Sequence, residues 1–94
     1  MDLQAFKVLL KKDTPDASLT GPLLALWKAG KGDWHGAHAV VQDDPGKDAA
    51  WVHAYLHREE GDLSNAGYWY QRAGRPVAKG SLEGEWEEIV RMLL

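Results

Sequence analysis

A repeated unit of helix, Gly-Asp turn and helix constrains this chain more than any other feature of its sequence. Residues 25–37 match residues 54–66 at an offset of 29 residues, so that Gly32-Asp33 lies over Gly61-Asp62. In each turn a glycine can supply the left-handed residue that ends one helix, and the aspartate can cap the next. Such a hairpin cannot bury its apolar face alone, so we expect the two hairpins to stack.

Apolar residues elsewhere in the chain recur at the three- and four-residue spacing of helices. This spacing predicts flanking helices over about 2–12 and 81–94, beside repeat-like hairpins over about 22–42 and 45–74. Gly and Pro fall between these segments, where they end helices, and no segment reads convincingly as a strand. A chain of 94 residues has room for one core. We therefore predict a single all-α domain over 1–94, built from five to six short antiparallel helices.

The helical stripes also predict which side chains form the core. The chain has five Trp and three Tyr but only one Phe, so large rings with polar tips must fill much of it. We expect the core to contain Phe6, Leu9, Leu23, Leu26, Trp34, Ala37, Val41, Val52, Leu56, Ala66, Trp69, Tyr70, Ala73, Trp86, Ile89 and Leu93.

The second hairpin carries a family pattern in residues 61–74, which read Gly-Asp-Leu-Ser-Asn-Ala-Gly-Tyr-Trp-Tyr-Gln-Arg-Ala-Gly. This order resembles tetratricopeptide and Sel1-like repeats, and Trp69-Tyr70 followed by Ala73 is particularly like the Sel1 type. The resemblance covers about 22–75, and its dense second half is also similar to a short bacterial chain type. The 29-residue spacing is shorter than the tetratricopeptide period of about 34. The resemblance implies helical hairpins that bind proteins.

Large side chains with polar tips predict a contact surface on the hairpins. Tyr68 and Arg72 fall on the less core-like face of the helix over about 62–74, and Tyr and Arg are favoured at protein interfaces. Trp51, Tyr55 and Arg58 resemble the inner-face positions of the repeat family's first helix. We expect these five residues to contact a protein partner or a second copy of the chain. The predicted function is a non-enzymatic protein-interaction module.

The four histidines form two helical pairs and suggest an alternative function. His53 and His57 are four residues apart with Glu60 on the same side, and His35 and His38 are three apart. Two imidazoles at this spacing can reach one metal ion, with His38 from another helix and Glu60 as further candidate ligands. The alternative is therefore a small metal-binding or acid–base protein that uses the His53/His57 helix face. The histidines could instead connect an aromatic core to solvent through hydrogen bonds.

Several classes of function are disfavoured by what the sequence lacks. There is no Cys and the net charge is −3, which excludes disulfide or thiolate sites and makes a nucleic-acid partner unlikely. The longest apolar run, residues 23–27, is far too short to span a membrane. No nucleophile elbow, phosphate loop or Ser/His/Asp order is present, so we expect no catalytic residues and no cofactor. The expected location is cytoplasmic.

Overall fold

The computed structural model describes all 94 residues and contains six α-helices and no strand. The all-α prediction is therefore confirmed. The helices are α1 (Leu3–Leu9), α2 (Gly21–Gly30), α3 (Trp34–Val41), α4 (Lys47–Glu59), α5 (Leu63–Ala73) and α6 (Leu82–Leu93). None of them is long and apolar enough to cross a bilayer.

The two Gly-Asp turns adopt the same backbone structure, 29 residues apart. Gly32 and Gly61 have φ values of 82° and 86°, in the left-handed region that glycine enters at little cost. The amide of Asp33 donates to the carbonyl of Lys28, and the matching amide of Asp62 donates to His57, both at 2.9 Å. Each aspartate then accepts a hydrogen bond from the backbone amide three residues on, which caps the following helix. The sequence repeat is thus also a repeat of local structure.

The first helix ends earlier than its apolar pattern predicts. It stops at Leu9 rather than near residue 12. The amides of Leu10, Lys11 and Lys12 bond to carbonyls three residues back rather than four, which is the tighter spacing typical of frayed helix ends. Lys31 completes the arrangement, because its ammonium binds the carbonyl oxygens of Leu10 and Lys12 from α2's end.

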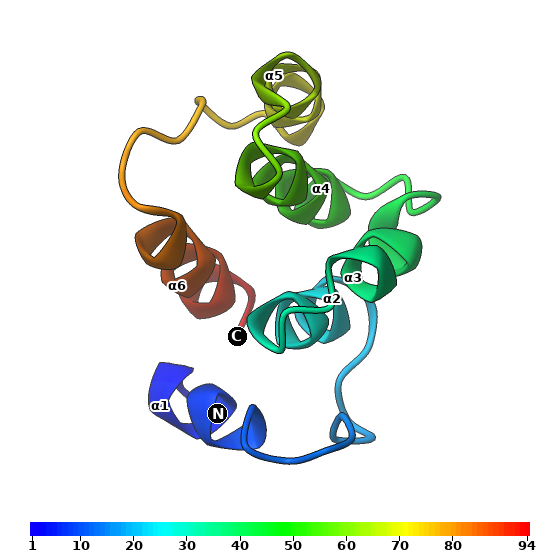
Figure 1. The fold of residues 1–94 in the computed structure, drawn as a ribbon, viewed down its shortest axis with the longest axis vertical. Helices are drawn as coiled ribbons and strands as arrows, with labels where there is room; N and C mark the ends of the chain where they lie inside the picture. The colour runs from blue at the N-terminus through cyan, green and yellow to red at the C-terminus, as the bar shows by residue number, and fades with distance from the viewer.

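The two hairpins lie side by side, with α6 packed across them (Figure 1). Helices α2 and α3 form one hairpin and α4 and α5 the other, and α3 packs on α4. Helix α6 contacts α4 and α2, the first helix of each hairpin, while α1 packs against α6. The chain thus covers the first-helix face of its own hairpins.

Most of the predicted core is buried, with exceptions at its edge. The side chains of Leu9, Leu23, Trp34, Trp69 and Leu93 pack against the core but stay partly exposed. The other predicted core residues are buried, and Trp27, Trp51 and Tyr55 join them. Trp34 and Trp69 lie at the edge of the core, where Trp34 stacks on the half-buried His38 and Trp69 on the buried His53.

Candidate metal centre

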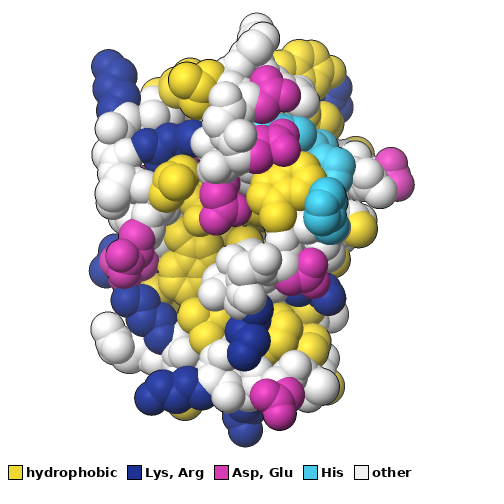
Figure 2. Space-filling model, in the orientation of Figure 1, with side chains coloured by type: hydrophobic (Ala, Val, Ile, Leu, Met, Phe, Trp, Pro, Cys, Tyr) yellow, Lys and Arg dark blue, Asp and Glu magenta, His cyan; other side chains and the backbone are white.

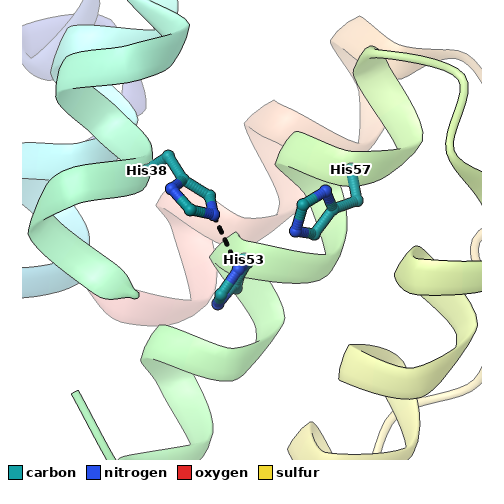
Figure 3. Close-up of side chains that lie close together, drawn as sticks. All are labelled: His38, His53 and His57. Atoms are coloured by element: carbon teal, nitrogen blue, oxygen red, sulfur yellow. Dashed lines mark hydrogen bonds between the residues drawn. The ribbon is translucent and has the colours of Figure 1, made fainter. Parts of the chain in front are cut away.

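Three histidines from two helices converge where α3 packs on α4 (Figure 3). His38 comes from α3, and His53 and His57 lie on successive turns of α4. The Nε2 atoms of His38 and His53 are 3.0 Å apart. One potential ligand atom from each of the three residues lies within 4.8 Å of the other two. The packing of the hairpins therefore supplies the third imidazole that the helical spacing of His53 and His57 requires.

Two tryptophans hold the imidazoles in position. The Trp34 ring stacks on His38 at 4.8 Å between centroids, and its indole donates a 2.7 Å hydrogen bond to the carbonyl of Leu56. The Trp69 ring stacks on His53 at 3.8 Å. These stacking contacts fix the planes of the His38 and His53 rings without using an imidazole nitrogen. The imidazole nitrogens can therefore bond with one another, as His38 and His53 do through their Nε2 atoms, or with an ion.

His57 is oriented by polar neighbours on both sides of its ring. Its Nδ1 lies 2.7 Å from a carboxylate oxygen of Glu60, and its Nε2 lies 3.3 Å from the side-chain amide nitrogen of Asn65. With Asn65 donating to Nε2, the ring proton is on Nδ1 and is donated to Glu60. A carboxylate on the far nitrogen is the usual outer partner of a metal-binding histidine. Here the Nε2 lone pair accepts the hydrogen bond from Asn65, so an ion at Nε2 would replace this amide.

His53 is the least satisfied member of the cluster. Only 4% of its surface is exposed, and its Nδ1 is buried without a hydrogen-bond partner. Burial, reinforced by the nearby His38 and His57, lowers the pKa of His53 to about 4. Burial also lowers the pKa of His38. Both rings are therefore neutral at pH 7, and neutral imidazole is the form that binds metal.

One pair of imidazole nitrogens, from His38 and His53, is spaced close to what a tetrahedral ion needs. Zinc–nitrogen bonds of roughly 2.0–2.1 Å place two tetrahedral nitrogen ligands about 3.3 Å apart. The observed 3.0 Å between His38 and His53 Nε2 requires only a small separation of the rings. Three imidazoles suit zinc, copper, nickel and cobalt, and they leave at least one coordination position for water or another ligand.

The predicted metal residues divide into an inner group and a rim. His38, His53 and His57 come together, whereas Glu60 lies at the rim. One of its carboxylate oxygens is within 4.8 Å of a potential ligand atom of His57 and of Asp62. His35 is exposed and packs edge-on to Trp34, outside the group. The apolar pattern placed Trp34 and Trp69 in the core, and no pattern in the sequence gave Asn65 a role at the histidines.

The five residues predicted to contact a partner do not share one exposed face. Trp51 and Tyr55 are 4% and 5% exposed, so the expected open inner face is not available in this structure. Arg58 is also largely covered, because its guanidinium binds the Glu85 carboxylate of α6 at 3.1 Å. Tyr68 is exposed on α5, as is Arg72.

Helix α6 covers the inner face because it carries groups that match it. The buried Glu85 carboxylate accepts hydrogen bonds of 2.8 and 2.6 Å from the Tyr70 hydroxyl besides its bond with Arg58. The Trp86 indole donates a 2.9 Å hydrogen bond to the carbonyl of Leu26 on α2. A residue pattern cannot show this pairing, since Leu26 and Trp86 are 60 residues apart.

Comparison with known proteins gives no relative for the chain. No family model, no curated protein and no solved structure matches it. The site is therefore defined by its geometry alone.

Proposed function

We propose that this protein binds a divalent transition-metal ion through His38, His53 and His57. The observation that carries the proposal is the convergence of one ring nitrogen from each residue within 4.8 Å. Glu60 is its positioning residue, because it holds the His57 ring through Nδ1. Histidine side chains gather at one place on the molecular surface (Figure 2), and the half-buried His38 gives an ion a route to the group.

The ion would connect the two hairpins. His38 belongs to the first hairpin and the other two ligands belong to the second, so a bound ion would cross-link α3 to α4. An ion that binds only the folded chain stabilises it by about 2.7 kcal/mol at a hundredfold excess over Kd. The competing interpretation is a hydrogen-bonded network of neutral histidines that needs no ion.

Calorimetric titration of metal-free protein with Zn²⁺ and Co²⁺ separates these interpretations. We expect one ion per chain, with visible absorption bands typical of tetrahedral cobalt. His38→Gln and His53→Gln should weaken binding at least about a hundredfold, and Glu60→Gln about ten- to a hundredfold. The matched control is His35→Gln, because His35 is exposed on the same helix but outside the group.

Either of two results would refute the proposal. One is no heat and no cobalt spectrum with folded, metal-free protein at pH 7.5. The other is an equal loss of affinity in His35→Gln and His53→Gln, which would indicate nonspecific binding to surface imidazoles. Circular dichroism of each variant checks that α-helix content is retained.

We also propose a tetratricopeptide/Sel1-like protein-interaction role for the outer face of α5. Tyr68 is 52% exposed, and Arg72 donates a 3.0 Å hydrogen bond to its hydroxyl. The Arg72 guanidinium lies 5.7 Å from the centroid of the Tyr68 ring and 5.2 Å from that of Trp69. This arrangement supports the proposal, because a preordered Tyr–Arg pair loses little entropy on binding.

The partner would be another protein or a second copy of this chain, in the cytoplasm. Light scattering over a concentration series tests self-association, and capture of a partner tests the heterologous case. Tyr68→Ala combined with Arg72→Ala should abolish both kinds of association with the fold intact. Unchanged association in this double variant would contradict the assignment of this surface.

A further inference from the structure

A cavity lies on the side of α4 opposite its histidines. It is bordered by the ends of α1, α2 and α4 and by the start of α6. Its volume is about 420 Å³, within the range of about 300–1,000 Å³ typical of small-molecule sites. The apolar part of its wall is formed by Leu10, Leu82 and Trp86. Nothing in the histidine cluster borders this space, so a ligand here would be independent of the metal ion.

Tyr55 presents a hydroxyl group at this cavity that has no partner within the chain. The residue is 5% exposed and lines the cavity, yet its hydroxyl makes no hydrogen bond with any other group of the chain. By contrast, the other buried tyrosine, Tyr70, binds both carboxylate oxygens of Glu85. The one buried side-chain polar atom without a partner is His53 Nδ1, so the Tyr55 hydroxyl is itself accessible from the cavity. Burial raises the pKa of Tyr55, and the nearby Glu59 carboxylate raises it further. The hydroxyl therefore stays protonated and neutral.

The charges around the cavity favour a cation. Glu59 and Glu83 both line it, and the one basic residue of the lining, Lys7, is paired with Glu87. Gly30 adds the carboxyl end of α2, the end at which the helix dipole is negative. Burial raises the pKa of Glu59, as expected for a carboxylate without a neighbouring cation.

We propose that this cavity binds a small organic ammonium ion, that is, an amine with a short apolar chain. The ammonium group would bind the Glu59 carboxylate and donate to the Tyr55 hydroxyl, with Glu83 adding negative charge. The apolar chain would lie against Leu10 and Trp86. Tryptophan also attracts cations through its ring face, so the same wall suits both ends of such a ligand.

Calorimetric titration with n-hexylammonium, in the presence of a metal chelator, tests the proposal. Hexan-1-ol and hexanoate serve as probes of the same length without positive charge. We expect hexylammonium to bind at least about tenfold more tightly than either of them. Glu59→Gln should weaken binding about tenfold and Tyr55→Phe about fivefold, as expected for the loss of a charged and a neutral hydrogen-bond partner. Asp48→Asn, at the exposed start of α4, should leave it unchanged.

Amide and indole NMR shifts locate the bound ligand, with Trp86 and Gly30 expected to move. Equal binding of hexan-1-ol would overturn the proposal, because the cavity would then be a plain apolar crevice. Equal weakening by Asp48→Asn and Glu59→Gln would also overturn it, since the ligand would only be attracted by the net negative charge. No binding by folded protein at about 10 mM hexylammonium would exclude the site.

Discussion

Acidification should destabilise the folded chain through His53. The folded protein holds the pKa of this ring at about 4, against an ordinary value of 6.5. Between these values the unfolded chain binds more protons, so the free energy of unfolding falls as the pH falls. The His53 contribution is present above pH 6.5 and is lost as the pH drops toward 4. Between pH 7 and pH 5 the loss is about 2 kcal/mol.

This loss is large enough to measure by thermal or urea unfolding. For a domain of this size it corresponds to a Tm decrease of about 8–16 °C. The comparison variant is His53→Phe, which keeps a flat ring against Trp69 but cannot take up a proton. The free energy of unfolding of both proteins is measured from pH 5 to pH 8 with chelator present. Groups that do not contact His53, such as Glu59, titrate alike in both proteins, so the difference between the two curves reports His53 together with His38, its hydrogen-bond partner.

The expected result is a difference curve that changes by about 2 kcal/mol over this range. His53→Phe should therefore be less sensitive to acid, whatever its absolute stability at pH 7. Parallel curves for the two proteins would refute the argument. So would an NMR titration in which the His53 ring of the folded protein takes up a proton near pH 6.5. Added Zn²⁺ should oppose the acid effect above pH 6 and fail to do so once protons displace it.

Three further substitutions, with Met92→Ala as a control, test the packing of α6 and the outer face of α5. Arg58→Ala should lower the free energy of unfolding by about 3–5 kcal/mol in urea, because the buried Glu85 carboxylate loses its cation; a loss below 1 kcal/mol would contradict this. Trp86→Ala should cost about 3–5 kcal/mol by leaving a cavity, whereas Met92→Ala, at an exposed position of the same helix, should change the melting temperature little. Tyr68→Ala should alter stability by less than about 1 kcal/mol in the same assay; a larger loss would show that the exposed ring is structural.

The local structure was largely predictable because its causes are close in sequence. Asp33 and Asp62 cap helices through amides three residues away, and Gly61 tolerates a positive φ whatever packs around it. The helix over about 2–12 was the clearest error in a boundary. The end of this helix depends partly on Lys31, which follows α2 and binds the carbonyl oxygens of Leu10 and Lys12 just past α1.

The candidate metal site was partly predictable for the same reason. His53 and His57 share a helix face by spacing alone, and the sequence also suggested His38 as a third ligand. Their ring orientations depend on Trp34 and Trp69, which come from α3 and α5. The apolar pattern assigned both tryptophans to the core because it records hydrophobic character and not the neighbouring element.

By itself, the sequence determined an all-α chain with two matching hairpins, because helix propensity, caps and turns act over a few residues. Only the tertiary structure decided that α6 covers the inner face, that Trp51 and Tyr55 are therefore buried, and that the Glu85 carboxylate meets Arg58 and Tyr70. These outcomes depend on contacts between residues 15 to 60 positions apart. Such contacts form only when whole helix faces match in shape, charge and hydrogen bonding.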